Sequence, residues 1–166
     1  MNTGEVVNLH VALLRLKEIT NPNQPYPVKF SYAAALNLTR TKDIFETYKS
    51  VADPTTIPSY VTYEELRKQL AEEMCEKNED GTPLVANNQY VLLPAVRANY
   101  DKELLKIKDQ LPTFDDDMKA HEARVLELND VPTDVRIHMI KIDHLPTELP
   151  ISLMDGLQYM IKDDDE

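Results

Sequence analysis

The sequence predicts a mainly helical α+β fold, in which long antiparallel helices carry a small β-hairpin or sheet. Three observations predict this class. Apolar residues recur every three or four positions along most of the 166 residues. The 11 prolines fall between these apolar stretches, whereas only 3 glycines occur. The stretch from Thr62 to Leu111 combines a helix, a turn at Glu79-Asp80-Gly81, a two-stranded hairpin and a second helix.

The first two helices are predicted from their apolar stripes. Val6 to Ile19 forms one stripe, and the prolines of residues 21–27 end it. Ser31 is expected to cap the next helix, and Asp53-Pro54 to stop it. The second helix has a seam that we expect to face another helix. Its members are Ala34, Leu38, Thr41, Phe45, Tyr48 and Ala52.

The third helix is predicted to begin with a capping box. In this motif Thr62 accepts a hydrogen bond from a first-turn amide, and Glu65 reaches back to the amide of the cap. The helix is expected to end near Asn78. The hairpin follows, with Asn87-Asn88 at its turn, because asparagine tolerates the positive φ that a two-residue turn requires.

The second half of the chain continues this helical pattern. Pro94 suits the first turn of a helix, and Pro112 breaks that helix. Thr113 is expected to cap the next one, with acidic residues in its first turn where the helix dipole favours them. Its stripe consists of Phe114, Met118, His121, Val125 and Leu128, and Asn129 can close it.

The C-terminal part is predicted to hold a strand and a short helix. Asp134 to Ile142 is rich in β-branched residues and is predicted as a strand in the same sheet as the hairpin. The last helix has the stripe Ile151, Met154, Leu157 and Ile161, which Gly156 weakens. We expect one domain over residues 1–162 and a disordered acidic tail over residues 163–166.

Charge and cysteine content limit the partners. The net charge is −11, and most of it lies in Asp115-Asp116-Asp117 and in residues 163–166. No cluster of Lys and Arg predicts nucleic-acid binding, and no apolar run or signal peptide predicts a membrane, so we expect a soluble, cytoplasmic protein. Cys75 is the only cysteine, so no disulfide forms within the chain.

Three groups of residues are candidates for chemical sites. Asp115, Asp116, Asp117 and His121 could hold a metal, but no second histidine or carboxylate pair joins them at ligand spacing. His138, Asp143 and His144 could be ligands or an acid–base pair, although a strand histidine at a sheet edge is the simpler interpretation. Cys75 lies among glutamates, an unreactive setting. We therefore expect no enzyme activity, no cofactor, no metal and no small-molecule substrate.

Several short motifs carry a family resemblance. They are Pro27-Val28-Lys29, the run Y-A-A-A-L-N-L from Tyr32, K-N-E-D-G from Lys77, and N-Q-Y-V-L-L from Asn88. In this order, over residues 5–161, the chain resembles a family of small, uncharacterised proteins of tailed bacteriophages and prophages. The resemblance implies phage origin and a non-enzymatic role.

Two functions follow as hypotheses. The first is a non-catalytic interaction or assembly factor, of the virion or of host takeover, that binds a protein partner or a second copy of itself. The alternative is an acidic inhibitor that mimics nucleic acid at a host nucleic-acid-binding protein. The expected contact residues lie on the hairpin. They are Leu84, Val85, Asn87, Asn88 and Tyr90.

Overall fold

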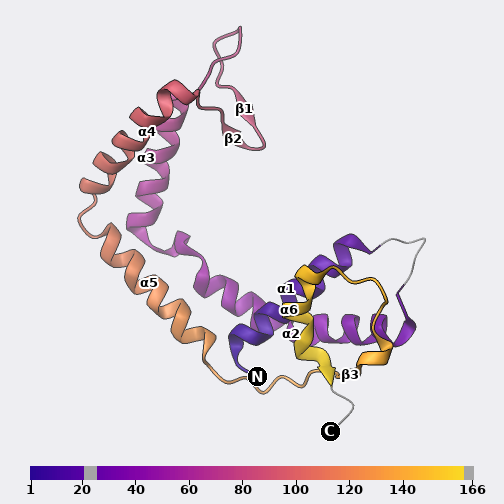
Figure 1. The fold of residues 1–166 in the computed structure, drawn as a ribbon. Coiled ribbons are helices and arrows are strands. Elements are labelled where there is room, and N and C mark those ends of the chain that lie inside the picture. Colours follow the sequence, from indigo (N-terminus) through magenta and orange to yellow (C-terminus); the bar gives the residue numbers. More distant parts are fainter. Residues whose placement is uncertain (21–25, 163–166) are drawn as a thin grey trace. The chain divides into compact units, whose positions relative to one another are not determined.

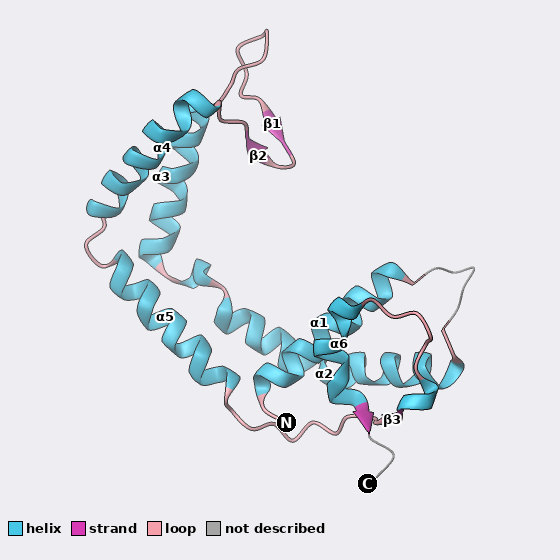
Figure 2. Cartoon of the chain, in the orientation of Figure 1, coloured by secondary structure: helices cyan, strands magenta, loops and turns pink. Residues whose placement is uncertain are grey.

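The computed structural model describes residues 1–20 and 26–162, and it confirms a mainly helical α+β fold (Figures 1 and 2). The predicted acidic tail lies outside the described residues. Within them the helices are α1 (Thr3–Ile19), α2 (Val28–Ala52), α3 (Pro58–Met74), α4 (Pro94–Asp109), α5 (Phe114–Asn129) and α6 (Ile151–Leu157). Short 3₁₀ turns are η1 (Pro54–Thr56), η2 (Ile142–His144) and η3 (Gln158–Met160). The strands are β1 (Val85–Ala86), β2 (Gln89–Tyr90), β3 (Ile140–Lys141) and β4 (Ile161–Lys162).

The chain divides into two compact units. Residues 1–52 and 124–166 form one, which we call the core unit, and residues 53–123 form the other, the hairpin unit. The helix α5 contributes its first residues to the hairpin unit and its last to the core unit. That residues 1–162 form a single domain stays a prediction.

The core unit is built around α1, which packs against both α2 and α6. The predicted α1 stripe is confirmed, because its members are almost fully buried: Val6, Leu9, Leu13 and Leu16. A capping box starts this helix. The Asn2 side chain accepts from the Glu5 amide at 2.9 Å, and the Glu5 carboxylate accepts from the Asn2 amide at 2.9 Å.

The helix α6 packs closely on α1 because residue 156 is glycine. A Cβ added to Gly156 would lie 2.6 Å from the Ala12 Cβ and 2.6 Å from the Asn8 carbonyl oxygen. The predicted stripe is wrong at Ile151, which is 88% exposed. The residues that face the core are Leu153, Gly156, Leu157 and Met160. Gly156 therefore lies at the contact between the two helices, where the sequence had suggested only a weak point.

The helix α2 presents a face slightly rotated from the predicted seam. It begins at Val28, so the expected cap Ser31 lies inside it, and the Ser31 amide donates to the Pro27 carbonyl at 2.9 Å. The buried residues are Phe30, Ala33, Asn37 and Thr41, of which only Thr41 belongs to the predicted seam. Of the buried residues outside the seam, Asn37 is held by hydrogen bonds to the His138 backbone, which an apolar pattern does not reveal.

The predicted strand from Asp134 to Ile142 is largely wrong. Only β3 is a strand, and it pairs in parallel with β4. The preceding residues are held by α2 side chains. The Arg40 guanidinium donates to the Arg136 carbonyl at 2.9 Å, while the Asn37 amide donates to the His138 carbonyl at 3.0 Å and accepts from the His138 amide at 2.7 Å. The single sheet is also wrong, because β1–β2 and β3–β4 are separate two-stranded sheets.

In the hairpin unit α3 and α4 run antiparallel, as predicted, with the hairpin joining them at one end (Figure 2). The expected capping box at Thr62 is wrong. The helix α3 begins one turn earlier, with Pro58 at its first position, and the Thr62 hydroxyl donates to the Pro58 carbonyl at 3.0 Å. It ends at Met74, short of Asn78, because the backbone of Glu76 already bonds to Leu84 and Val91.

The hairpin itself is confirmed. The strands β1 and β2 are antiparallel, and Asn87 and Asn88 have φ angles of 50° and 60° at the turn. The earlier turn contains Gly81 at φ 82°, whose amide donates to the Asn78 carbonyl at 2.9 Å. The helix starts at Pro94 and after Thr113 also agree with the predictions. Among the helices of the described residues, none combines the length and the apolar character that a membrane crossing requires.

Candidate functional site

The hairpin unit contains a concavity of about 650 Å³ between the hairpin and its two helices. We call it the hairpin groove. Three cationic side chains and two tyrosines give it its character. The full lining is Arg67, Lys68, Ala71, Val85, Asn88, Gln89, Tyr90, Leu92, Arg97 and Tyr100.

The structure brings three of the five predicted contact residues into this groove. Val85, Asn88 and Tyr90 line it, with Val85 52% exposed. Asn87 is exposed at the turn outside the lining, and Leu84 is half-buried. The backbone of Leu84 stabilises the base of the hairpin, since its amide donates to the Glu76 carbonyl and its carbonyl accepts from the Val91 amide. Thus the groove lies on one side of the hairpin, and only some of the predicted contact residues line it.

Arg67 is fixed in place by Glu64. Its Nε and Nη2 donate to the two carboxylate oxygens of Glu64, each at 2.8 Å, in a bidentate pair. These hydrogen bonds lower the pKa of Glu64, and the same pair raises the pKa of Arg67 further. A planar guanidinium held in this way presents its remaining donors in a defined direction.

Tyr90 and Arg97 are the other recognition groups of the groove. The Tyr90 hydroxyl lies 3.5 Å from a carboxylate oxygen of Glu72. Partial desolvation, and then the Glu72 charge, raise the pKa of Tyr90, so its hydroxyl stays protonated and can donate at neutral pH. Arg97 is exposed, and it makes no hydrogen bond or ion pair with any other residue in the described ranges.

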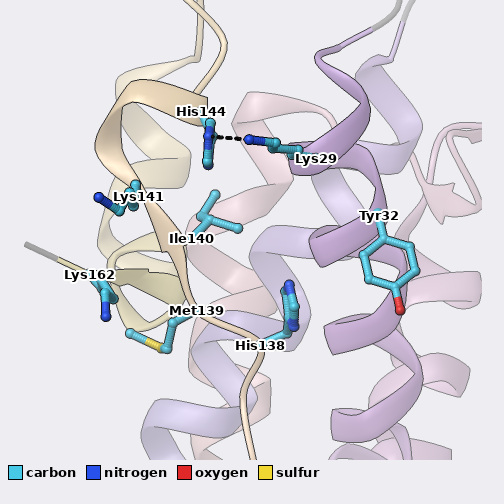
Figure 3. A pocket seen from close by; sticks show the side chains of 8 residues that line it. All are labelled: Lys29, Tyr32, His138, Met139, Ile140, Lys141, His144 and Lys162. Carbon is cyan, nitrogen blue, oxygen red and sulfur yellow. Dashed lines mark hydrogen bonds between the residues drawn. The ribbon is translucent and has the colours of Figure 1, made fainter.

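A second concavity, of about 400 Å³, lies in the core unit (Figure 3). We call it the basic pocket. Lysine and histidine side chains from three segments of the chain line it, together with an exposed tyrosine. Its lining is Lys29, Tyr32, His138, Met139, Ile140, Lys141, His144 and Lys162.

The local folding explains why the segments that carry these residues lie together. Lys29 and Tyr32 stand on the first turns of α2. The parallel pairing of β3 with β4 places Lys141 directly opposite Lys162. The Lys29 ammonium donates to Nε2 of His144 at 2.9 Å, as Figure 3 shows, so that imidazole accepts at Nε2. The Tyr32 ring meets the His138 ring at right angles, with centroids 5.6 Å apart.

The other candidate metal ligands and the candidate nucleophile lie outside both concavities. Asp117 accepts from the Ser59 hydroxyl at 2.6 Å, and Asp115 lies 4.0 Å from the Lys108 ammonium. His121 is buried in the hairpin unit, and the Cys75 thiol is buried and points to the Glu72 carbonyl at 3.2 Å. Across residues 1–20 and 26–162, no three His, Cys, Asp or Glu side chains gather so that they could hold a metal ion.

The chain matches no protein-family model, and no curated protein or solved structure is significantly similar to it. The arrangement of its own residues therefore carries the functional argument.

Sequence reasoning missed the helical side of the hairpin groove and the whole basic pocket. A hairpin that joins two antiparallel helices must lie near the ends that it connects. Arg67 on α3 and Arg97 on the first turn of α4 could therefore have been named as its neighbours. The side to which the hairpin folds depends on tertiary contacts. For the basic pocket the signal was weaker, since Lys29 lies on α2, more than a hundred positions before the segments of Lys141 and Lys162, and the β3–β4 pairing brings only those last two together.

Proposed function

We propose that this chain is a non-catalytic interaction protein of phage type, acting in the host cytoplasm or the virion, whose hairpin groove binds an extended acidic segment of a partner protein. The carrying observation is the groove itself. Tyrosine and arginine dominate the binding energy of many protein interfaces, and here Tyr90, Tyr100 and Arg97 share one concavity. The phage-type motifs of the sequence support the same class.

Charge argues for an acidic partner segment. The chain has a net charge of −11, yet Arg67, Lys68 and Arg97 all line this groove. An acidic segment is repelled by most of the surface and attracted here, which favours one docking position over others. The turn at Asn87-Asn88 leaves the ribbon short and exposed, so an extended segment can lie along it.

A matched pair of variants on one helix tests the groove. Arg97→Glu reverses the free cation of the groove, whereas Lys102→Glu makes the same change at an exposed position of α4 outside its lining. Proteins captured from infected-cell lysate by the wild type should be lost with Arg97→Glu and retained with Lys102→Glu, and titration of the purified captured protein should show the same order. Equal binding by both variants would remove the groove from the proposal.

Self-association has its own test. If the partner is a second copy, sedimentation velocity should show a dimer whose fraction rises with concentration and falls with Arg97→Glu. A monomer at every concentration leaves a different protein as the partner.

The acidic-inhibitor alternative rests on the exposed carboxylates. Asp115 is near Lys108 and Asp117 is bonded to Ser59, so two of the three aspartates have structural contacts in α5. The alternative requires that neutralising Asp115, Asp116 and Asp117 to Asn, in a chain that ends at Lys162, abolishes binding to a basic host protein. Retained binding would exclude it.

A further inference from the structure

We infer that the acidic segment of the partner binds as an added β-strand, paired with the free edge of β2, and carries its acidic residues at every second position. This mode of binding rests on the proposed function of the hairpin groove and specifies its partner further. The observation behind it is the direction of the backbone groups of Tyr90 and Leu92, two residues that also line the groove.

The register of the hairpin sets that direction. The Val91 amide donates to the Leu84 carbonyl at 2.9 Å, so the backbone groups of these two residues point into the hairpin. Along an antiparallel ladder such pairs alternate with pairs whose N–H and C=O groups point outward. Val85 and Tyr90 form the next pair, so the N–H and C=O of Tyr90 point away from β1.

Leu92 extends this free edge to the next alternate position. The backbone stays extended at Leu93, with φ −64° and ψ 143°, and the N–H and C=O of Leu92 make no hydrogen bond to another described residue. Tyr90 and Leu92 therefore offer donors and acceptors at the spacing that an added strand uses. The outer edge of β1 is less suitable, because Pro83 lacks an N–H and its carbonyl accepts from the Asn78 side chain at 3.4 Å.

The groove determines the side-chain pattern of the added strand. Side chains along a strand point alternately to opposite faces, and those of Val85, Tyr90 and Leu92 line the groove. Every second side chain of a strand paired with β2 therefore points to the same face. Lys68 and Arg97 line the groove from α3 and α4, and both are exposed and form no ion pair with another described residue. Carboxylates are thus favoured at these alternate positions.

Exchange of single amides tests the added strand directly. The probe is a synthetic octapeptide of alternating glutamate and threonine, added at saturation to the full chain at low salt. Hydrogen exchange at the Tyr90 and Leu92 amides should slow at least about tenfold, since each amide gains a hydrogen bond in the complex. The Val85 amide, which points outward on the opposite edge of the hairpin, is the internal control and should keep its rate.

Further peptides separate strand addition from charge attraction. A peptide of the same composition with its glutamates in one block should bind at least about fivefold more weakly, because fewer carboxylates then face the cations. Two other peptides carry N-methyl groups on every second amide, in the two possible phases. Alternate amides of an added strand donate to β2 and the others point away. One phase should therefore weaken binding at least about tenfold, and the other should change it less than about twofold.

Three results would overturn the added strand while the groove remains a site for acidic segments. They are unchanged exchange at the Tyr90 and Leu92 amides in the saturated complex, equal weakening by both methylation phases, and equal binding of the alternating and block peptides. In each case binding that falls with Arg97→Glu, and not with Lys102→Glu, still supports the groove. If none of the peptides binds at millimolar concentration, the added strand is also excluded, and capture from lysate decides the proposed function separately.

Discussion

The core unit and the hairpin unit stabilise themselves in different ways. Every large side chain of the described residues that is almost completely buried lies in the core unit: Val6, Leu9, Leu13, Phe30, Asn37, Thr41, Leu157 and Met160. The hairpin unit instead relies on a ring pair in which Phe114 is buried and Tyr63 half-buried. Tyr63 and Phe114 have centroids 4.6 Å apart, and the Lys108 ammonium lies 5.2 Å from the Phe114 centroid.

Polar groups follow the same division. In the core unit His10, Thr41 and Asn37 are buried and bonded to one another or to the backbone. In the hairpin unit the arginines and tyrosines of the hairpin groove face a concavity. The core unit thus uses its polar groups to fix a packing arrangement, whereas the hairpin unit presents them at the surface. This difference predicts that core-unit changes affect stability and groove changes affect binding.

The largest stability loss is expected from Gly156→Ala. The new Cβ meets the Asn8 carbonyl and the Ala12 Cβ at 2.6 Å, and a backbone atom cannot move aside as a flexible side chain can. Forcing α6 away from α1 should cost about 3 kcal/mol of unfolding free energy. Urea unfolding measures it. Gly4→Ala is the control, because the atoms nearest to its new Cβ belong to the Asn129 side chain, at 3.3 Å, and the change should stay within about 1 kcal/mol. Equal losses in both variants would contradict the close α1–α6 contact.

A smaller loss, of about 2 kcal/mol, is expected from Asn37→Ala. It leaves the amide and the carbonyl of His138 without the partners that Asn37 supplies at 2.7 Å and 3.0 Å. Urea unfolding and hydrogen exchange of the His138 amide would both report it. Thr39→Ala removes an exposed hydroxyl bonded within α2 and should change stability by less than about 0.5 kcal/mol. If the His138 amide stayed fully protected from exchange in Asn37→Ala, the two hydrogen bonds between Asn37 and the His138 backbone would not be what holds this segment.

Gly81→Ala should affect the hairpin unit alone. The positive φ of 82° costs an alanine about 1 kcal/mol, and nothing lies within 4 Å of the added Cβ. Hydrogen exchange should therefore quicken at the Gly81 and Thr82 amides, while amides of α1 keep their wild-type rates. Faster exchange in α1 would mean that the two units are energetically coupled, which would support the prediction of a single domain.

The two units also differ in how far the sequence predicted them. Local sequence signals predicted the structure correctly where a residue type restricts its own backbone, as with positive φ at Asn87-Asn88 and the helix start at Pro94. They predicted it wrongly where a side chain distant in the sequence determines the backbone conformation. Asn37 holds residues near His138 in an irregular path that β-branched composition alone predicted as a strand. The capping box predicted at Thr62 was wrong, because α3 already begins at Pro58 and the Thr62 hydroxyl is bonded inside the helix.

The same limits apply to the two sites. Three hairpin residues of the groove were predictable, because an exposed ribbon follows from its turn chemistry. The basic pocket was not, because Lys141 and Lys162 become neighbours only through a parallel pairing of two residues per strand. Such a short ladder leaves almost no periodic signal in the sequence.

The smallest expected effect is a pH dependence confined to the core unit. The His10 Nδ1 lies 2.8 Å from the Thr41 hydroxyl, which donates to the Asn37 carbonyl, so Nδ1 carries the proton and donates. Burial lowers the pKa of His10, and the Glu46 charge opposes this only in part. Below the unfolded pKa of 6.5 the unfolded chain therefore binds more protons, so the stability present above that pH is lost as the pH falls toward the folded pKa.

The slope from one histidine cannot exceed about 1.4 kcal/mol per pH unit. His10→Asn keeps a donor toward Thr41 but does not titrate, so it should remove this component between neutral and mildly acidic pH. NMR titration of the His10 ring in the wild type should give a pKa below 6.5. The Phe45 ring stacks on the His10 ring, with centroids 4.3 Å apart. A pKa at or above 6.5 would mean that this site accommodates protonated His10, and that the core unit is less closely packed than its buried residues indicate.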